Sequence, residues 1–278
     1  MPGTHNVQGA AHMGCEPGHL PGFVPIKLGR DAFTAAWSSP LSAAPGLNLM
    51  EMMDAAEHSE LKALWAIGYD VSFTNPDSIR THGALGGLDF VVVQDLFFNE
   101  LAREFGHVFL PAASPFEKDG TFMNSERRVQ RIRRAVAAPG HALPDWEIVC
   151  GVARAMGHGK GFAFHSAEEI WNEIRSVWKA GQGITYDRLE HGGLQWPCPD
   201  EAHPGTQILH VDSFACSKTA PLHIDDRIKE GELFATFHAS ATGVNHLTGQ
   251  GRDKQAMTPE YKIVAVRIDK REGGSGDG

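Results

Sequence analysis

Short apolar runs alternate with helix-like stretches between residues 48 and 112, and this alternation constrains the fold more than any other feature of the chain. Short buried strands separated by helices predict a parallel α/β sheet, because parallel neighbours need a crossover connection. Ligands of such sheets bind beyond the carboxyl ends of the strands. We expect strands over residues 63–67, 89–95 and 107–112, and helices over residues 48–57, 77–85 and 99–105.

The flanking regions have less regular patterns. Residues 1–45 are rich in Gly and Pro, which predicts loops with one short helix near 33–37. Helical patterns return at 144–157 and 166–178, where Trp171 belongs to an apolar stripe that indicates core packing. The other members of that stripe are Ile170, Ile174 and Val177.

The carboxyl-terminal third is rich in turn residues. A strand is expected over 207–210, and two more over 232–237 and 261–268, followed by a disordered Gly-Ser tail. Two strands around a long loop cannot bury a face by themselves. The sequence therefore predicts an incomplete β-domain at this end.

Composition excludes several classes of function. The formal charge of -9 makes a general polyanion-binding surface unfavourable, so no nucleic-acid partner is expected. The four cysteines form no C-x-x-C pair and the 15 histidines form no H-E-x-x-H motif, so neither an iron–sulfur cluster nor another metal site is expected from this chain. We also expect no secretory signal, no membrane span and a cytoplasmic location.

Polar side chains follow two of the predicted strands. Asp70 comes after the first strand, and Gln94 and Asp95 end the second. At the end of a strand, a carboxylate can accept hydrogen bonds from the donor edge of a guanine or from a ribose hydroxyl. The alternative is that these side chains only close Asx turns through their own backbone.

The stretch "EKDGTFMNSERRVQRIRRAV", residues 117–136, contains five arginines after a glycine turn. It allows three interpretations: a nucleic-acid surface, a solvated helix face paired with acids, or a set of contacts for a large anionic cofactor. Arginine binds phosphate through two parallel hydrogen bonds, whereas the acidic net charge argues against nucleic acid. No catalytic triad or Walker loop is present, so no catalytic residue is assigned.

Longer blocks of sequence resemble the molybdopterin oxidoreductases, most closely the alpha (catalytic) subunits of formate dehydrogenases that use bis-molybdopterin guanine dinucleotide. The resemblance spans nearly the whole chain and includes the segments "NVQGAAHMGCEPGHLPGF", "LKALWAIGYDVSFTNP", "LDFVVVQDLFFNELAREFGHVFLPAASPFEKDGTFMNSERRVQRIRRAV", "DWEIVCGVARAMG", "GLQWPCPDEAHPGTQILH" and "ATGVNHLTGQGRDKQAMTPEYKIVAVRI".

The resemblance implies a fold and a cofactor site. It implies a Rossmann-like α/β cofactor domain over residues 1–195, a connection over 196–222, a remnant of the family's final β-barrel over 223–270, and a tail over 271–278. It implies that the molybdenum or tungsten cofactor is contacted by Gly68, Asp70, Gln94, Asp95, Lys118, Gly120, Asn124, Glu126, Arg127, Arg128, Asn245, Thr248, Tyr261 and Lys262.

Departures from the family pattern qualify this expectation. Nothing here corresponds to the family's cysteine-rich cluster domain or to its Cys or selenocysteine metal ligand, and Pro2 stands where relatives carry an arginine thought to orient formate. Much of the barrel is expected to be missing at a junction near residues 222–224. The chain is thus expected to begin after the catalytic elements.

The implied activity is oxidation of formate to carbon dioxide, with electrons leaving through iron–sulfur clusters held elsewhere. A chain lacking the metal ligand is expected to be inactive alone and to need an electron-transfer or complementary catalytic subunit. Two alternatives stay open: a related enzyme acting on nitrate or another oxyanion, and a non-catalytic module that binds cofactor or nucleotide.

Overall fold

The computed structural model describes residues 6–124 and 127–205. These residues divide into two compact units. The first unit comprises residues 6–48, 94–97 and 109–205, and the second comprises residues 49–93 and 98–108. The expected strands at 207–210, 232–237 and 261–268, the junction near 222–224 and the barrel remnant lie outside the described residues.

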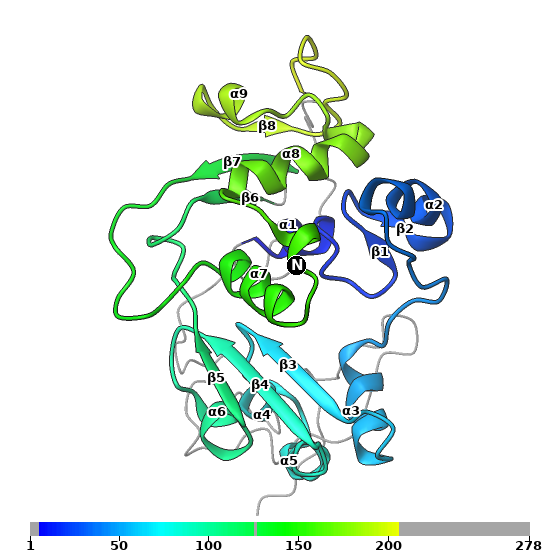
Figure 1. The fold of residues 1–278 in the computed structure, drawn as a ribbon, viewed down its shortest axis with the longest axis vertical. Helices are drawn as coiled ribbons and strands as arrows, with labels where there is room; N and C mark the ends of the chain where they lie inside the picture. The colour runs from blue at the N-terminus through cyan, green and yellow to red at the C-terminus, as the bar shows by residue number, and fades with distance from the viewer. Residues whose placement is uncertain (1–5, 125–126, 206–278) are drawn as a thin grey trace, which may run out of the picture. The chain divides into compact units, whose positions relative to one another are not determined.

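The predicted α/β alternation is confirmed, with boundaries that differ by no more than two residues. Strands β3, β4 and β5 form a three-stranded sheet in that order, and their arrows run in the same direction in Figure 1. The elements are α3 (Leu49–Glu57), β3 (Ala63–Ile67), α4 (Val71–Thr74), α5 (Ser78–Gly86), β4 (Phe90–Asp95), α6 (Glu100–Glu104) and β5 (Val108–Pro111).

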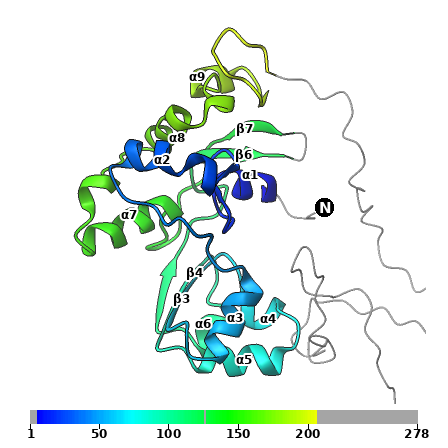
Figure 2. The ribbon, with the colours of Figure 1, turned by 90° about the vertical axis from the view of Figure 1, so that its right-hand side faces the viewer.

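Side-chain caps and apolar burial account for the second unit. The carboxylate of Asp77 accepts from the backbone N–H of Arg80, which starts α5, and Asn99 caps α6 in the same way. Val91 and Val93 of β4 are completely buried. Figure 2 shows α3, α4 and α5 on one side of the sheet.

The first unit has more regular structure than its Gly- and Pro-rich sequence predicts. Residues 6–45 contain two helices and a small antiparallel pair, and Pro25 directly precedes a 12-residue helix. The elements are α1 (Val7–His12), β1 (His19–Leu20), β2 (Val24–Pro25), α2 (Ile26–Trp37), β6 (Gly120–Met123), β7 (Arg128–Ile132), α7 (Asp145–Ala155), η1 (Gly159–Phe162), α8 (Ala167–Val177), η2 (Lys179–Gly181), α9 (Tyr186–Glu190) and β8 (Leu194–Gln195).

The arginine-rich stretch forms a β-hairpin, which excludes the interpretation as a helix face. Strands β6 and β7 pair antiparallel, with Met123 opposite Val129, and β8 adds to β7 on its other side. The Asn124 side chain accepts from the backbone N–H of Arg128 at 3.0 Å and closes the turn. Arg127 in that turn has a positive φ of 60°, an uncommon conformation for a residue with a Cβ.

A tryptophan cluster forms the core of the first unit. Trp178 is 1% exposed and its ring meets the ring of Trp171 edge-on at a centroid distance of 6.1 Å. The Trp171 indole also donates to the carbonyl of Ile184 at 2.7 Å. Gly22 and Gly181 pack against Trp178 so closely that a Cβ on either would overlap the indole. The predicted core role of Trp171 is confirmed.

The part of the chain that the structure describes contains neither a candidate membrane span nor a candidate metal site. None of their helices is both long enough and apolar enough to cross a membrane. Their His, Cys, Asp and Glu side chains nowhere gather in a group of three or more that could hold a metal ion.

Candidate functional site

One carboxylate joins two of the predicted cofactor residues in the first unit. The Gln94 Nε2 donates to Asp145 Oδ1 at 2.8 Å, and the Lys118 ammonium forms an ion pair with Asp145 Oδ2. Gln94 is fully buried, yet its Oε1 has no hydrogen-bond partner in the described part of the chain. Because an unpaired buried acceptor is costly, this oxygen is suited to receive a donor from a ligand.

A second group of polar side chains gathers at the turn of the β6–β7 hairpin. The guanidinium carbon of Arg127 lies 4.7 Å from the centroid of the Trp196 ring. The other face of this group is formed by His12 of α1, whose ring centroid is 4.7 Å from that of Trp196. Over residues 6–124 and 127–205, the Arg127 guanidinium makes no hydrogen bond or ion pair.

His12 is held in its neutral form. It is 4% exposed, and burial, followed by the nearby positive charge of Arg127, lowers its pKa from 6.5 to about 4. Its Nδ1 atom is buried without a hydrogen-bond partner among the described residues, as is the Nε1 atom of Trp196. Three unpaired polar groups therefore meet at this turn.

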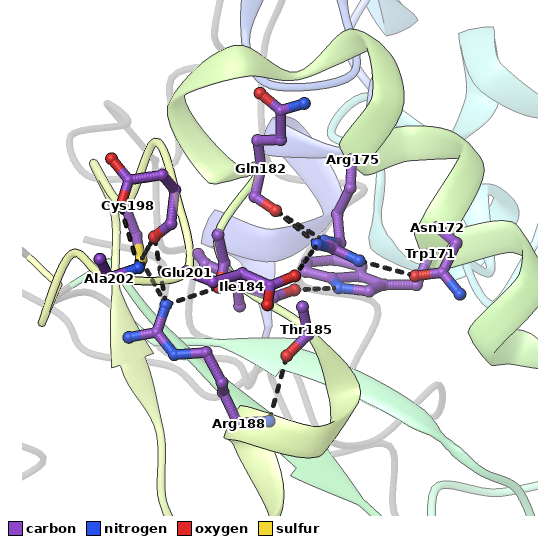
Figure 3. Close-up of polar contacts among 12 residues, drawn as sticks. Trp171, Asn172, Arg175, Gln182, Ile184, Thr185, Arg188, Cys198, Glu201 and Ala202 are labelled. Carbon is purple, nitrogen blue, oxygen red and sulfur yellow. Dashed lines mark hydrogen bonds and ion pairs between the residues drawn. The ribbon is translucent and has the colours of Figure 1, made fainter.

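The chain on the carboxyl side of Trp196 is fastened by Arg188 of α9 (Figure 3). Its guanidinium donates to the carbonyls of Gly183 at 2.7 Å and His203 at 2.6 Å, and it contacts the buried Cys198 sulfur at 3.3 Å. The Cys198 backbone also donates to the carbonyl of Ala180 at 2.6 Å. These contacts hold the backbone two residues beyond Trp196.

Other arginines of the hairpin have partners inside the first unit. Arg131 stacks on the Tyr186 ring at 3.8 Å and pairs with Glu190 at 3.2 Å, and Arg133 pairs with the same glutamate. Arg128 donates to the carbonyl of Gly193 at 3.0 Å. Much of the basic run is therefore structural, which distinguishes Arg127 from Arg128, Arg131 and Arg133.

In the second unit, the predicted residues Gly68 and Asp70 follow β3. Gly68 has a φ of 62°, and a Cβ placed there would meet no atom within 4 Å. The carboxylate of Asp70 is fully engaged, because one oxygen accepts from Ser72 Oγ at 2.6 Å and the other from the backbone N–H of Glu100 at 3.1 Å. Asp70 thereby connects α4 to the start of α6.

This linkage gives a stability prediction. Replacing Asp70 with alanine should lower the free energy of unfolding by about 1–3 kcal/mol, because several donors lose their acceptor. Asparagine keeps one carbonyl oxygen and should cause a smaller loss. Urea denaturation followed by circular dichroism measures both variants, and an unchanged midpoint for alanine would show that Asp70 has no role in the fold.

The remaining predicted residues lie in different places. Gly120 begins β6, Asn124 closes the hairpin turn, and the Asp95 carboxylate accepts from the backbone N–H of Leu96 at 2.6 Å. Glu126 and the carboxyl-terminal members Asn245, Thr248, Tyr261 and Lys262 lie outside the described residues. Their contacts to a cofactor stay predictions.

The sequence analysis missed three residues that organise these groups: Asp145, Trp196 and His12. Asp145 carries a weak signal, since an acidic residue after Pro144 is typical of the first turn of a helix. Trp196 and His12 carry none, because their partners are distant in the sequence.

Comparison with known proteins identifies the family. Residues 5–155 match the sequence model described as molybdopterin oxidoreductase, and residues 206–265 match the one described as molydopterin dinucleotide binding domain. The F420-dependent formate dehydrogenase subunit alpha of Methanocaldococcus jannaschii is 45% identical over 212 residues, which cover 76% of this chain and 31% of that protein.

Two further relatives and one solved structure extend the comparison. The assimilatory nitrate reductase catalytic subunit of Bacillus subtilis is 36% identical over 222 residues, covering 77% of this chain and 31% of that protein. The F420-dependent formate dehydrogenase 1 subunit alpha of Methanococcus maripaludis is 31% identical over 350 residues, covering 96% of this chain and 52% of that protein. Acetylene hydratase from Pelobacter acetylenicus covers 51% of this chain and 20% of its own, with 18% identity and a TM-score of 0.44.

The alignment lengths bear on the organisation of the chain. The chain spans between about a third and a half of the length of these curated relatives. An alignment of 350 residues exceeds the 278 residues of this chain, so the M. maripaludis protein has residues without a counterpart here. Because the match over residues 5–155 includes more than half of the sequence, the chain belongs to the molybdopterin oxidoreductase family.

Proposed function

We propose that this chain is the cofactor-binding part of a formate dehydrogenase that uses bis-molybdopterin guanine dinucleotide. The observation that carries the proposal is the 45% identity to a formate dehydrogenase alpha subunit over 76% of the chain. The complete enzyme would oxidise formate to carbon dioxide. The chain alone is proposed to bind cofactor without catalysing the reaction.

The described residues fit an anionic dinucleotide. Among the residues that the structure describes, the Arg127 guanidinium has no hydrogen-bond or ion-pair partner and can donate to phosphate, and the buried Gln94 Oε1 can accept from a guanine N–H or a ribose hydroxyl. In the second unit, considered by itself, the space beside Gly68 leaves room for a ligand against the backbone. Asp70 and Lys118 would act mainly by holding their loops, since both already have protein partners.

Each residue has a role that follows from its contacts. Asp145 would fix Gln94 with its acceptor oxygen free, and would hold Lys118 within reach of a second phosphate. When bound, the cofactor's molybdenum or tungsten would take the two electrons released as formate becomes carbon dioxide and a proton. The protein groups named here would bind and orient the dinucleotide at a distance from that chemistry.

The proposal extends to organisation and partners. We assign residues 1–195 to the α/β cofactor domain, 196–222 to a connection, 223–270 to a β-barrel remnant and 271–278 to a tail. The similarity to proteins named as alpha subunits supports a partner subunit that transfers electrons or completes the catalytic site. The described cysteines are free, which suits the reducing cytoplasm as the proposed location.

Metal and pterin content test the proposed function. The full chain, purified from a host that makes the guanine dinucleotide, should contain about one cofactor per chain, measured as molybdenum or tungsten and as oxidised-pterin fluorescence. Gln94→Leu should lower this content about tenfold or more, because it removes a buried hydrogen-bonding side chain that faces the ligand. Arg133→Gln is the matched control, since this arginine is exposed and pairs only on the surface.

The outcomes separate clearly. Stoichiometric pterin in the wild type and the control, but not in Gln94→Leu, supports the proposed site. Neither metal nor pterin in the wild type would contradict cofactor binding by this chain.

A second candidate function rests on the similarity to the nitrate reductase, which covers 77% of the chain. The two candidates differ in the direction of electron flow. Complexes purified through the tagged chain should reduce an oxidised viologen dye with formate. Oxidation of a reduced viologen dye by nitrate, without the formate reaction, would favour the second candidate.

A further inference from the structure

Trp196 and Arg127 come from separate parts of the first unit, yet they share a polar and an aromatic contact. The guanidinium lies over the indole ring at 4.7 Å, and the Trp196 backbone N–H donates to the Arg127 carbonyl at 3.2 Å. An aromatic face attracts a guanidinium that stacks on it. The N–H donors lie at the edge of the guanidinium, so this stacking leaves them free. Within the described part of the chain, the Arg127 guanidinium is therefore oriented without making a hydrogen bond of its own.

We propose that Trp196 is a positioning residue that holds the Arg127 guanidinium for two parallel hydrogen bonds to a phosphate group of the dinucleotide. The inference rests on the proposed function and specifies which group of the ligand this arginine binds. It also assigns a purpose to the positive φ of Arg127, because strained backbone persists where the surrounding contacts impose it.

The surroundings make Trp196 a rigid support. Trp178 meets its ring at 6.0 Å on the core side, and the neutral His12 ring packs at 4.7 Å. A charged imidazole at His12 would repel the guanidinium, whereas the neutral ring leaves Arg127 as the cation of this group. The backbone beyond Trp196 is fastened by the Arg188 contacts to the carbonyls of Gly183 and His203.

Binding of guanosine diphosphate by the cofactor-free full chain tests the inference, with guanosine as the phosphate-free reference and calorimetry as the measurement. Wild type should bind the diphosphate more tightly than guanosine. Arg127→Gln should weaken diphosphate binding about 10- to 100-fold, since a charged hydrogen-bond donor is lost. Trp196→Leu should weaken it about 3- to 30-fold, whereas Trp196→Phe keeps an aromatic face and should stay within about threefold.

A double variant distinguishes positioning from a general effect on the fold. If Trp196 acts through Arg127, the Trp196→Leu/Arg127→Gln chain should bind no more weakly than Arg127→Gln alone. Arg133→Gln should stay within about twofold of wild type, since its partner is Glu190 on the surface.

Contrary outcomes identify which idea fails. If Arg127→Gln weakens binding and Trp196→Leu does not, the positioning role is overturned while the proposed function stands. If the two losses multiply in the double variant, Trp196 acts independently of Arg127 and the inference is overturned. Equal binding by wild type and Arg127→Gln would show that Arg127 does not bind the phosphate group. The same conclusion would follow if the wild type bound the diphosphate no more tightly than guanosine.

Discussion

Replacing Trp178 with alanine is expected to lower the free energy of unfolding by about 3–5 kcal/mol. The side chain is 1% exposed, and it touches both Trp171 and Trp196 at edge-on ring distances of 6.1 and 6.0 Å. Its loss would leave a cavity lined by rigid rings that cannot collapse into it. Urea denaturation of the full chain, with the midpoint and slope analysed together, measures the effect.

Two further variants control this result. Trp178→Phe should cause a smaller loss, because most of the ring remains and the indole N–H has no hydrogen-bond partner among the described residues. Leu28→Ala on α2 should change stability by less than about 0.5 kcal/mol, since Leu28 is 81% exposed. A loss for Trp178→Ala as small as that for Leu28→Ala would mean that the cluster is not a packed core.

Acidification is expected to remove about 3 kcal/mol of stability through His12. The unfolded chain protonates His12 near its ordinary pKa of 6.5, whereas burial and the charge of Arg127 lower the folded-state pKa to about 4. The contribution of His12 to the free energy of unfolding is therefore fully present above pH 6.5. It decreases by about 1.4 kcal/mol per pH unit as the pH drops from 6.5 to 4. Below pH 4 this group causes no further loss.

The variant His12→Phe isolates this effect from other titrating groups. Phe23 and Trp196 flank the imidazole with uncharged rings, Arg127 is the charged group that acts on it, and His19 stacks on the Phe23 ring at 4.0 Å. The unfolding free energies of wild type and variant should run parallel above pH 7 and converge by about 3 kcal/mol between pH 6.5 and 4. Parallel curves throughout would show that His12 is not buried in its neutral form.

The second unit was predictable because its information is local. Each strand is a short apolar run, and Asp77 and Asn99 cap α5 and α6, so the starts of these two helices are marked within the sequence itself. The α8 helix followed the same logic, with Ser166 as its cap. The spacing of apolar residues and the chemistry of the capping residue do not depend on the rest of the chain.

The hairpin and the polar groups around it depend on distant residues. Strand β7 mixes arginine, glutamine and apolar residues, and the partners of Arg127 and Arg131 lie more than 50 residues further along the chain, at Trp196, Tyr186 and Glu190. Gln94 and Asp145 are likewise separated by 51 residues. Composition identified a basic run, but it could not tell which of the arginines would find partners within the described residues.

The packing of glycine against tryptophan restricts how this protein can vary. Trp178 cannot become smaller without a cavity, and Gly22 and Gly181 cannot become larger without overlapping its ring. A compensating exchange is also blocked, because the two glycines approach the indole from separate segments of the chain. Homologous sequences should therefore keep the residues at all three positions or replace all three together. Sequence divergence in this part of the fold is then expected to be concerted.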